Sequence, residues 1–215
     1  MRAAALCLGW VVLVMAPSMA LAAPPLRRWS TFSVQCCDIT FQDGTEEAAR
    51  RYGAAAQEAY DGLTMMLGYT PRERTQILVT DDTDFSNGSA TPLPFHTIRL
   101  YARPPGAMSD LADYDDWARA LVLHEMVHII HTDTVRGVPA LLNRLVGKWW
   151  PPNILMPRWY IEGLAVMAET RLTTAGRAHS SLFDMYLRTA ALEERLWPLD
   201  VLSSGGRLFP GGNGA

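Results

Sequence analysis

The chain has little of several features that mark broad protein classes. It has a single lysine, Lys148, and its 19 Lys and Arg residues are outnumbered by 22 Asp and Glu, so the formal net charge is −3. This balance excludes the strongly basic surface that dominates nucleic-acid binding. Apolar residues make up 49% of the 215 and charged residues 19%. Such a composition indicates a globular domain rather than a disordered chain.

Cysteine is also scarce. Cys7 lies in the apolar N-terminal run, and the other two, Cys36 and Cys37, are adjacent. Two neighbouring cysteines without others do not make a structural zinc site, and a disulfide between neighbours strains the backbone. We interpret the pair as packing residues, with binding of other thiols or a strained disulfide as the alternatives.

Apolar runs of membrane-spanning length are absent beyond the N-terminus. There, Met1-Arg2 precedes an apolar stretch over residues 3–16, and Ala20-Leu21-Ala22 offers small residues for cleavage. These features predict a signal peptide over residues 1–22 and an exported protein, periplasmic, outer-envelope or secreted, of bacterial type. An uncleaved anchor is the alternative, although a settled spanning helix needs roughly 20 residues. One domain is expected over 23–205, with a Gly-rich tail at 206–215 that is interpreted as a possible truncated end.

Hydrophobic periodicity predicts an α+β fold, because strands and one helix precede several helices. The expected strands cover 31–35, 38–41, 76–80 and 97–101, and the expected helices cover 45–67, from 109 or 110 to 131 or 132, about 157–170 and about 180–196. Residues 81–94, 103–110 and 133–157 are expected to be loops or irregular. The irregular stretch contains an apolar run, Trp149, Trp150, Ile154, Leu155 and Met156. We expect this run to cover the core beside the site, with a membrane-touching or substrate-pocket loop as the alternative.

His124-Glu125-Met126-Val127-His128 lies within the second long predicted helix. Side chains four residues apart share a helix face, so His124 and His128 can bind one ion. Neutral imidazole nitrogens bind Zn²⁺ at about 2.0–2.1 Å. Glu125 points past such an ion, which suits a base acting on water rather than a ligand. The apolar flanks of the motif favour a buried metal helix over a chance occurrence of the pattern.

The expected third ligand is Glu162, on the next predicted helix. Two His and one Glu form the kind of hydrolytic zinc site that leaves a position open for water. Gly163 and the small residues after it would let the two helices approach closely, and the apolar neighbours of Glu162 argue against an ordinary surface acid. His131 is about 10 Å along the helix axis from His124. We therefore interpret His131 as a core histidine or one that supports a ligand.

The two motifs together resemble those of the gluzincin zinc metallopeptidases, in which H-E-x-x-H is followed by a Glu on the next helix. Residues 157–165 are similar to the P-x-W-x-x-E-G-x-A motif of peptidase-MA-like domains of bacterial envelope proteins, and residues 87–101 to the loop and edge strand before their zinc helix. The resemblance covers about residues 29–205. It implies a zincin-like domain, in which a small mixed sheet packs on the H-E-x-x-H helix and a mainly helical part follows.

The resemblance also implies roles for single residues. His124, His128 and Glu162 would bind Zn²⁺, and Glu125 would be the general base that activates water for peptide-bond hydrolysis. An edge strand at 97–101 would hold an extended peptide or protein substrate by strand addition.

The chain departs from this pattern in two ways. Thermolysin-like members carry an Asp four residues after the ligand Glu, to orient a ligand histidine, and here that position is Val166. Glu169 is either a substitute or an ordinary surface acid. No motif supplies the residue that stabilises the oxyanion. The candidates for that role are Tyr160, His179 and Tyr186.

The sequence therefore predicts an exported zinc-dependent peptidase that acts on peptides or proteins, does not bind nucleic acid, and is associated with the envelope in one interpretation. The main alternative is an inactive, zinc-stabilised envelope module that binds peptide or protein partners. A secreted structural domain with a chance motif is the third hypothesis. Substrate preference and oligomeric state are left open.

Overall fold

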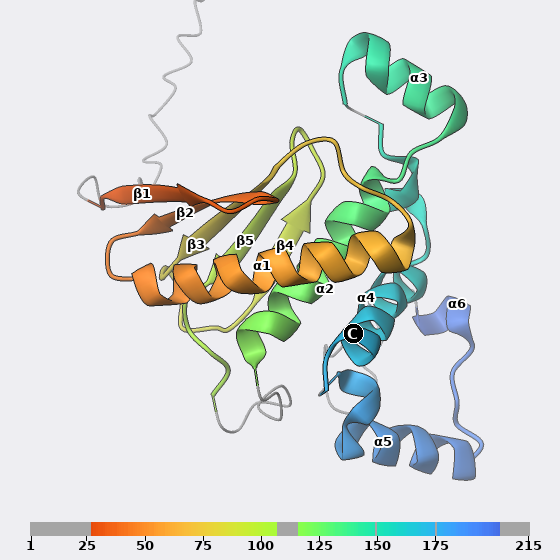
Figure 1. Cartoon of the computed structure of the whole chain (residues 1–215). Helices are drawn as coiled ribbons and strands as arrows, with labels where there is room; N and C mark the ends of the chain where they lie inside the picture. Colours follow the sequence, from red (N-terminus) through yellow and green to blue (C-terminus); the bar gives the residue numbers. More distant parts are fainter. Residues whose placement is uncertain (1–26, 107–115, 149, 175, 203–215) are drawn as a thin grey trace, which may run out of the picture.

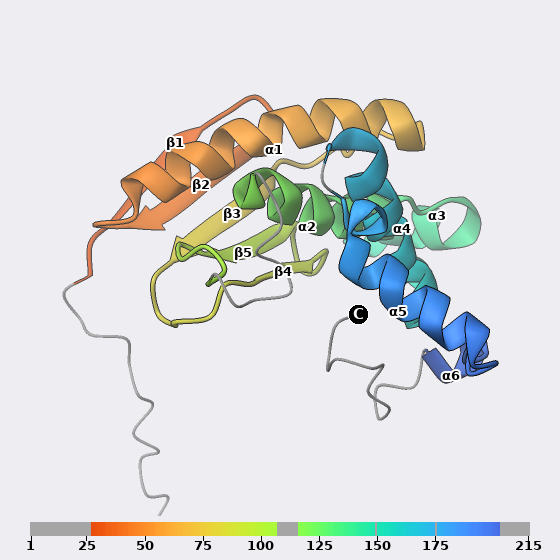
Figure 2. The same ribbon diagram turned by 90° about the horizontal axis from the view of Figure 1, so that it is seen from below.

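A computed structural model of the chain describes residues 27–106, 116–148, 150–174 and 176–202. A five-stranded mixed sheet is covered on one face by two long helices, and shorter helices follow beside them (Figures 1 and 2). The predicted α+β class is confirmed. The proposed signal peptide and the Gly-rich tail lie outside the described residues.

The sheet has the strand order β1-β2-β3-β5-β4. Its strands are β1 (Trp29–Ser33), β2 (Cys37–Gln42), β3 (Thr75–Thr80), β4 (Gly88–Thr91) and β5 (Thr97–Tyr101). The central strands β2, β3 and β5 are parallel, while β1 and β4 run antiparallel at the two edges. Alternate residues of the central strands, among them Ile39, Ile77, Val79, Ile98 and Leu100, are buried. The sheet therefore presents one apolar face to the helices.

Strand β4 corrects two sequence expectations. It lies within residues 81–94, which were expected to form a loop, and it pairs with β5 from Gly88↔Leu100 to Thr91↔Thr97. The sequence Gly-Ser-Ala-Thr has no apolar alternation to reveal it, because the strand depends on pairing with β5 and on packing against the second long helix. The prediction that residues 97–101 form the edge strand is consequently wrong. The edge on that side of the sheet is β4.

Helix α1 (Glu46–Leu67) begins one residue after its predicted start. Its buried face consists largely of small residues, Ala49, Gly53, Ala55, Ala56 and Ala59, together with Tyr52 and Leu63. Small side chains let the helix axis lie close to the sheet, and a Cβ at Gly53 would meet the Phe32 ring at 2.9 Å. The helix ends at Gly68, whose φ of 61° is the left-handed conformation of a helix C-cap.

Helix α2 (Trp117–Asp133) is enclosed by α1, by the sheet edge at β4 and by α4 (Arg158–Leu172). Twelve of its seventeen residues are buried, which fits a helix that is apolar around most of its circumference. Asp116 accepts a hydrogen bond from the Arg119 backbone N–H at 3.2 Å and caps the helix. The predicted earlier turns at residues 109–115 fall outside the described residues.

The segment between α2 and α4 corrects a further expectation. Residues 133–157 were expected to be irregular, but they contain α3 (Gly137–Val146) and the short 3₁₀ helix η1 (Pro152–Leu155). Pro139 is tolerated because it lies in the first turn of α3, where its missing N–H has no helical partner. The expectation that the adjacent apolar run covers the core is also wrong, because the side chains that are described there are exposed.

The C-terminal part consists of η2 (Arg177–His179), α5 (Ser181–Leu192) and α6 (Leu199–Leu202). Helix α5 ends earlier than the predicted residue 196, and Glu194 follows it with a φ of 54°. Cys36 and Cys37 are free and buried in the core. No helix among the described residues is long and apolar enough to cross a membrane.

Candidate metal site

Three ligand atoms from two helices converge beside the sheet edge. His124 and His128 project from one face of α2, with their ring centroids 4.7 Å apart, and Glu162 faces them from α4. Glu162 Oε2 lies 3.3 Å from His124 Nε2 and 3.7 Å from His128 Nε2. All three ligand atoms lie within 4.8 Å of one another, so the cluster could hold a metal ion. Helical spacing predicted the pairing of the two histidines, and the motif on the next predicted helix predicted that Glu162 joins them.

The spacing and chemistry of these atoms fit a small divalent cation. Ligands at 2.0–2.1 Å from a tetrahedral ion are about 3.4 Å apart, close to the two distances from Glu162. An unprotonated imidazole nitrogen and a carboxylate oxygen are both acceptors, so they repel one another unless a cation or a proton lies between them. The set of two nitrogens and one oxygen is one that Zn²⁺ commonly uses.

Glu169 supports His124 from behind. It is 1% exposed, and its Oε1 lies 2.6 Å from His124 Nδ1. A proton on Nδ1 shared with this carboxylate leaves Nε2 to face Glu162, which is how carboxylates commonly fix the tautomer of a metal-binding histidine. Burial by itself lowers the pKa of His124, but hydrogen bonds with Glu162 and Glu169 outweigh it and raise the pKa to about 9. A cation and a proton therefore compete for this site.

His128 lacks a comparable support among the described residues, since its buried Nδ1 has no hydrogen-bond partner. Burial, followed by the nearby charge of His124, lowers the pKa of His128 to about 4. The neutral form, which can bind a metal, is therefore favoured at neutral pH. Burial also opposes ionisation of Glu162, but the two histidines outweigh it, so the pKa of Glu162 is lowered.

Glu125 lies beside the cluster, against the edge strand. A Cβ placed on Gly88 of β4 would meet Glu125 Cγ at 3.0 Å and Oε1 at 3.1 Å. Glycine at this position therefore makes room for the Glu125 carboxyl group. Burial raises the pKa of Glu125 to about 7, so this group can exchange a proton near neutral pH.

A pocket of about 380 Å³ opens over these residues. Its walls come from α2, from α4 and from the start of β4; they are lined by Asn87, Gly88, Ser89, Ala90, Trp117, Ala120, Leu121, His124, Glu125, His128, Arg158, Glu162, Glu169 and Arg177. The edge strand and the candidate ligands thus share one cavity. Arg158 and Arg177 were not predicted from the sequence, because arginine near a motif carries no positional signal of its own.

The other candidates lie elsewhere. The His131 ring is 5.7 Å from the Tyr160 ring, measured between centroids, and neither residue lines the pocket. His179 Nε2 lies 3.3 Å from the Thr170 carbonyl oxygen, and neither His179 nor Tyr186 lines the pocket. Arg177 Nε is 3.7 Å from Glu169 Oε2, and Arg158 Nε is 3.8 Å from Glu162 Oε1. The described structure thus puts arginines, rather than the expected tyrosines or His179, beside the ligands.

No protein-family model and no solved structure matches the chain. A protein of Treponema pallidum (strain Nichols), described as an uncharacterized protein, is 26% identical over 193 residues. The match covers 83% of this chain but 17% of that protein, so the chain spans about a sixth of the length of its relative.

Proposed function

We propose that the chain is a zincin-like, zinc-dependent peptidase that acts on exported or envelope proteins or peptides. The observation that carries this proposal is the convergence of His124, His128 and Glu162 within 4.8 Å, with Glu125 in the same pocket. A sheet edge that runs into that pocket gives further support, because extended peptides bind to such edges.

In this proposal His124, His128 and Glu162 hold Zn²⁺, and Glu169 orients His124. Bound zinc would polarise the scissile carbonyl group and lower the pKa of a water molecule. Glu125 accepts a proton from the attacking water and delivers it to the leaving amine. The burial of Glu125, which raises its pKa to about 7, suits a group that must both accept and release that proton.

Strand β4 takes over the substrate-binding role that was expected for residues 97–101. It is an edge strand, and its first residues line the pocket. An extended substrate added to its open side would run past Glu125, with its backbone hydrogen-bonded to the strand.

Arg158 and Arg177 replace the expected tyrosines and His179 as candidates for stabilising negative charge on the reacting carbonyl oxygen. Both line the pocket, and both carry a fixed positive charge. Arg177 is held close to Glu169, whereas the Arg158 side chain is 59% exposed. Arg158 is therefore the more exposed of the two and the better placed to meet an incoming substrate.

The test combines metal analysis of the purified protein with an assay on a peptide library. Glu125→Gln should keep about one zinc per chain and lose turnover about 10²- to 10⁴-fold. His128→Ala should lose the zinc. Glu47→Gln, at an exposed position in the first turn of α1, is the charge control that should change neither property. Turnover at the wild-type level in Glu125→Gln would refute the mechanism. Stoichiometric zinc without cleavage of any peptide would instead favour the inactive binding module.

A further inference from the structure

Helix α3 stands away from the body of the molecule, beyond the end of α2 (Figure 1). Its apolar residues fall on one side of the helix, and most of them face solvent. The exposed fractions are 68% for Val138, 58% for Leu141, 71% for Leu145 and 67% for Val146. A helix that packs on a core buries such a face instead.

The opposite side of α3 contacts the chain that returns from the helix. Asn143 Nδ2 donates a hydrogen bond to the Trp150 carbonyl oxygen at 2.9 Å, and Asn143 Oδ1 accepts one from the Trp150 N–H at 3.1 Å. The polar side thus holds the returning chain, while the apolar side points outward. This orientation is the reverse of that found in a core helix.

The outward apolar surface continues past the helix. The side chains of Trp150, Ile154, Leu155 and Met156 are 38%, 50%, 79% and 42% exposed. We refer to residues 137–148 and 150–156 as the apolar projection. Clustered exposed apolar side chains of this kind mark interaction sites rather than ordinary protein surface.

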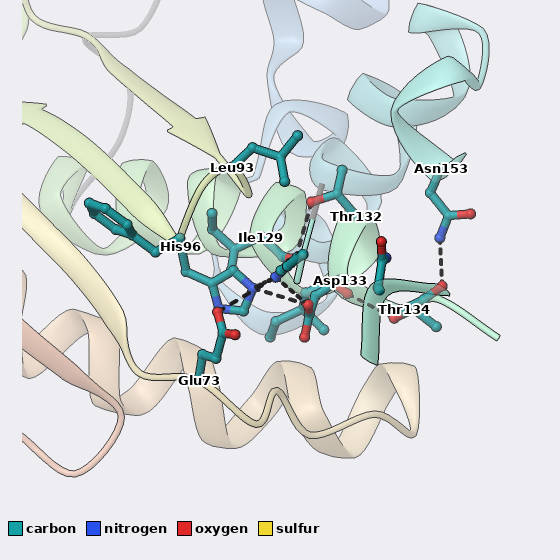
Figure 3. A network of polar contacts seen from close by, with 12 residues as sticks. Glu73, Leu93, His96, Ile129, Thr132, Asp133, Thr134 and Asn153 are labelled. Carbon is teal, nitrogen blue, oxygen red and sulfur yellow. Dashed lines mark hydrogen bonds and ion pairs between the residues drawn. The ribbon is translucent and has the colours of Figure 1, made fainter. Parts of the chain in front are cut away.

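A polar network fixes the base of the apolar projection to the body. Lys148 contacts both Asp133, at the end of α2, and His96, whose Nε2 is 3.1 Å from Asp133 Oδ1 (Figure 3). Asn153 Nδ2 donates to the carbonyl oxygens of His131 and Thr134, each at 2.8 Å (Figure 3). The projection is therefore held in place at its base while its apolar side is presented outward.

The charge of this region identifies the occupant. Between residues 134 and 161 the sequence contains no Asp or Glu, whereas Arg136 and Arg144, at the start and near the end of α3, are both basic and exposed. The whole chain, in contrast, has a net charge of −3. Apolar and tryptophan side chains flanked by arginines are the pattern of helices that lie in the interface of an anionic bilayer.

We propose that the apolar projection inserts into the surface layer of an anionic lipid membrane, with α3 parallel to the membrane plane. Val138, Leu141, Leu145 and Val146 enter the acyl boundary, and Arg136 and Arg144 contact lipid phosphates. This inference does not depend on the peptidase proposal, because it uses none of the residues of the metal site.

The test is flotation of the purified protein with vesicles of phosphatidylcholine, alone or mixed with phosphatidylglycerol. The N-terminus is determined first, since an uncleaved apolar leader would itself bind lipid. The wild type should float with the anionic vesicles. Leu141→Glu with Leu145→Glu should lower the partition coefficient roughly 100-fold, because each leucine contributes about tenfold when it is buried. Arg136→Gln with Arg144→Gln should lower it roughly 20- to 30-fold.

The matched control is Met65→Glu with Leu192→Glu, two apolar side chains on α1 and α5 that are 86% and 80% exposed. This variant adds the same two negative charges as Leu141→Glu with Leu145→Glu. Its partition coefficient on anionic vesicles should therefore fall only by the effect of those charges and otherwise match the wild type. Wild-type protein that fails to float with anionic vesicles overturns the proposal. A dimer in solution that Leu141→Glu with Leu145→Glu dissociates, without vesicle binding, overturns it in favour of self-association. Equal loss of binding in the control variant also overturns it, because the effect would then come from charge alone.

Discussion

Replacement of Glu169 by Gln tests how far metal binding depends on a residue that touches no metal. The Glu169 side chain is 2% exposed, and its Oε1 lies 2.6 Å from His124 Nδ1. A contact this short and this buried is a charge-assisted hydrogen bond that solvent screens little. Gln keeps the size of Glu and can still accept a hydrogen bond, but it lacks the negative charge that makes the imidazole a stronger ligand.

The expected magnitude follows from the kind of bond that is changed. Hydrogen bonds to charged groups contribute about 1.5–3 kcal/mol. Loss of a carboxylate that supports a metal-binding histidine typically lowers metal affinity about 10- to 100-fold, or about 1.4–2.8 kcal/mol. We therefore expect Glu169→Gln to bind zinc 10- to 100-fold more weakly than the wild type and still to fold.

The assay is a zinc titration against a competing chromophoric chelator at pH 7.5, with circular dichroism to verify folding. Glu47→Gln, an exposed acid in the first turn of α1, controls for the change in net charge. Glu162→Gln should weaken binding more than Glu169→Gln, because it alters a ligand atom directly. Equal zinc affinity in wild type and Glu169→Gln would refute the reasoning that Glu169 positions His124.

Three further predictions address the pocket, the base of the projection and the metal. Gly88→Ala should lower peptidase turnover about 100-fold while zinc content stays at the wild-type level, because the added methyl group displaces Glu125. Ser30→Ala, at an exposed position on β1 at the opposite edge of the sheet, should have little effect on either measurement. Burial alone would raise the pKa of Asp133, but hydrogen bonds from His96 and Lys148 hold it well below its ordinary value. The stability advantage of the wild type over Asp133→Asn in urea unfolding should therefore be complete above about pH 5 and decrease as the pH falls below about 4; an advantage that grows on acidification would contradict this sign. Removal of zinc by a chelator should lower the Tm by about 5–10 °C if zinc had been present at about 100 times its Kd, and an unchanged Tm would argue against a bound metal.

The parts of the fold that sequence predicted are those set by local periodicity. Helix α1 shows its apolar spacing over six turns and ends at a glycine, so its bounds were predicted to within one residue. Strand β4 was missed because its sequence has no apolar alternation and the strand is defined by its partner β5. Helix α3 does carry the apolar spacing of a helix, at residues 138, 141, 142, 145 and 146, but the stretch was interpreted as irregular. Its apolar side faces solvent rather than the core.

The metal site shows the same difference between features set by local sequence and features that depend on tertiary packing. His124 and His128 are brought together by helical spacing alone, and the convergence of Glu162 was inferred from a motif. Glu169 was left undecided between two interpretations, because its burial depends on how α4 packs against α2. Arg177 could not be predicted at all, since its proximity to Glu169 arises from the turn after α4.

The packing of α4 on α2 shows which part of a local interpretation the structure uses. Gly163 and the small residues after it were expected to allow close approach of the two helices, and a Cβ at Gly163 itself would meet nothing within 4 Å. Ala165 and Ala168 are the completely buried residues of α4, and Glu169 is next to the second of them. The buried small side chains are thus those that follow Gly163, rather than Gly163 itself. Because α4 packs with this face inward, two carboxylates reach His124, with Glu162 at Nε2 and Glu169 at Nδ1. A surface-facing Glu169 would have left His124 with only one.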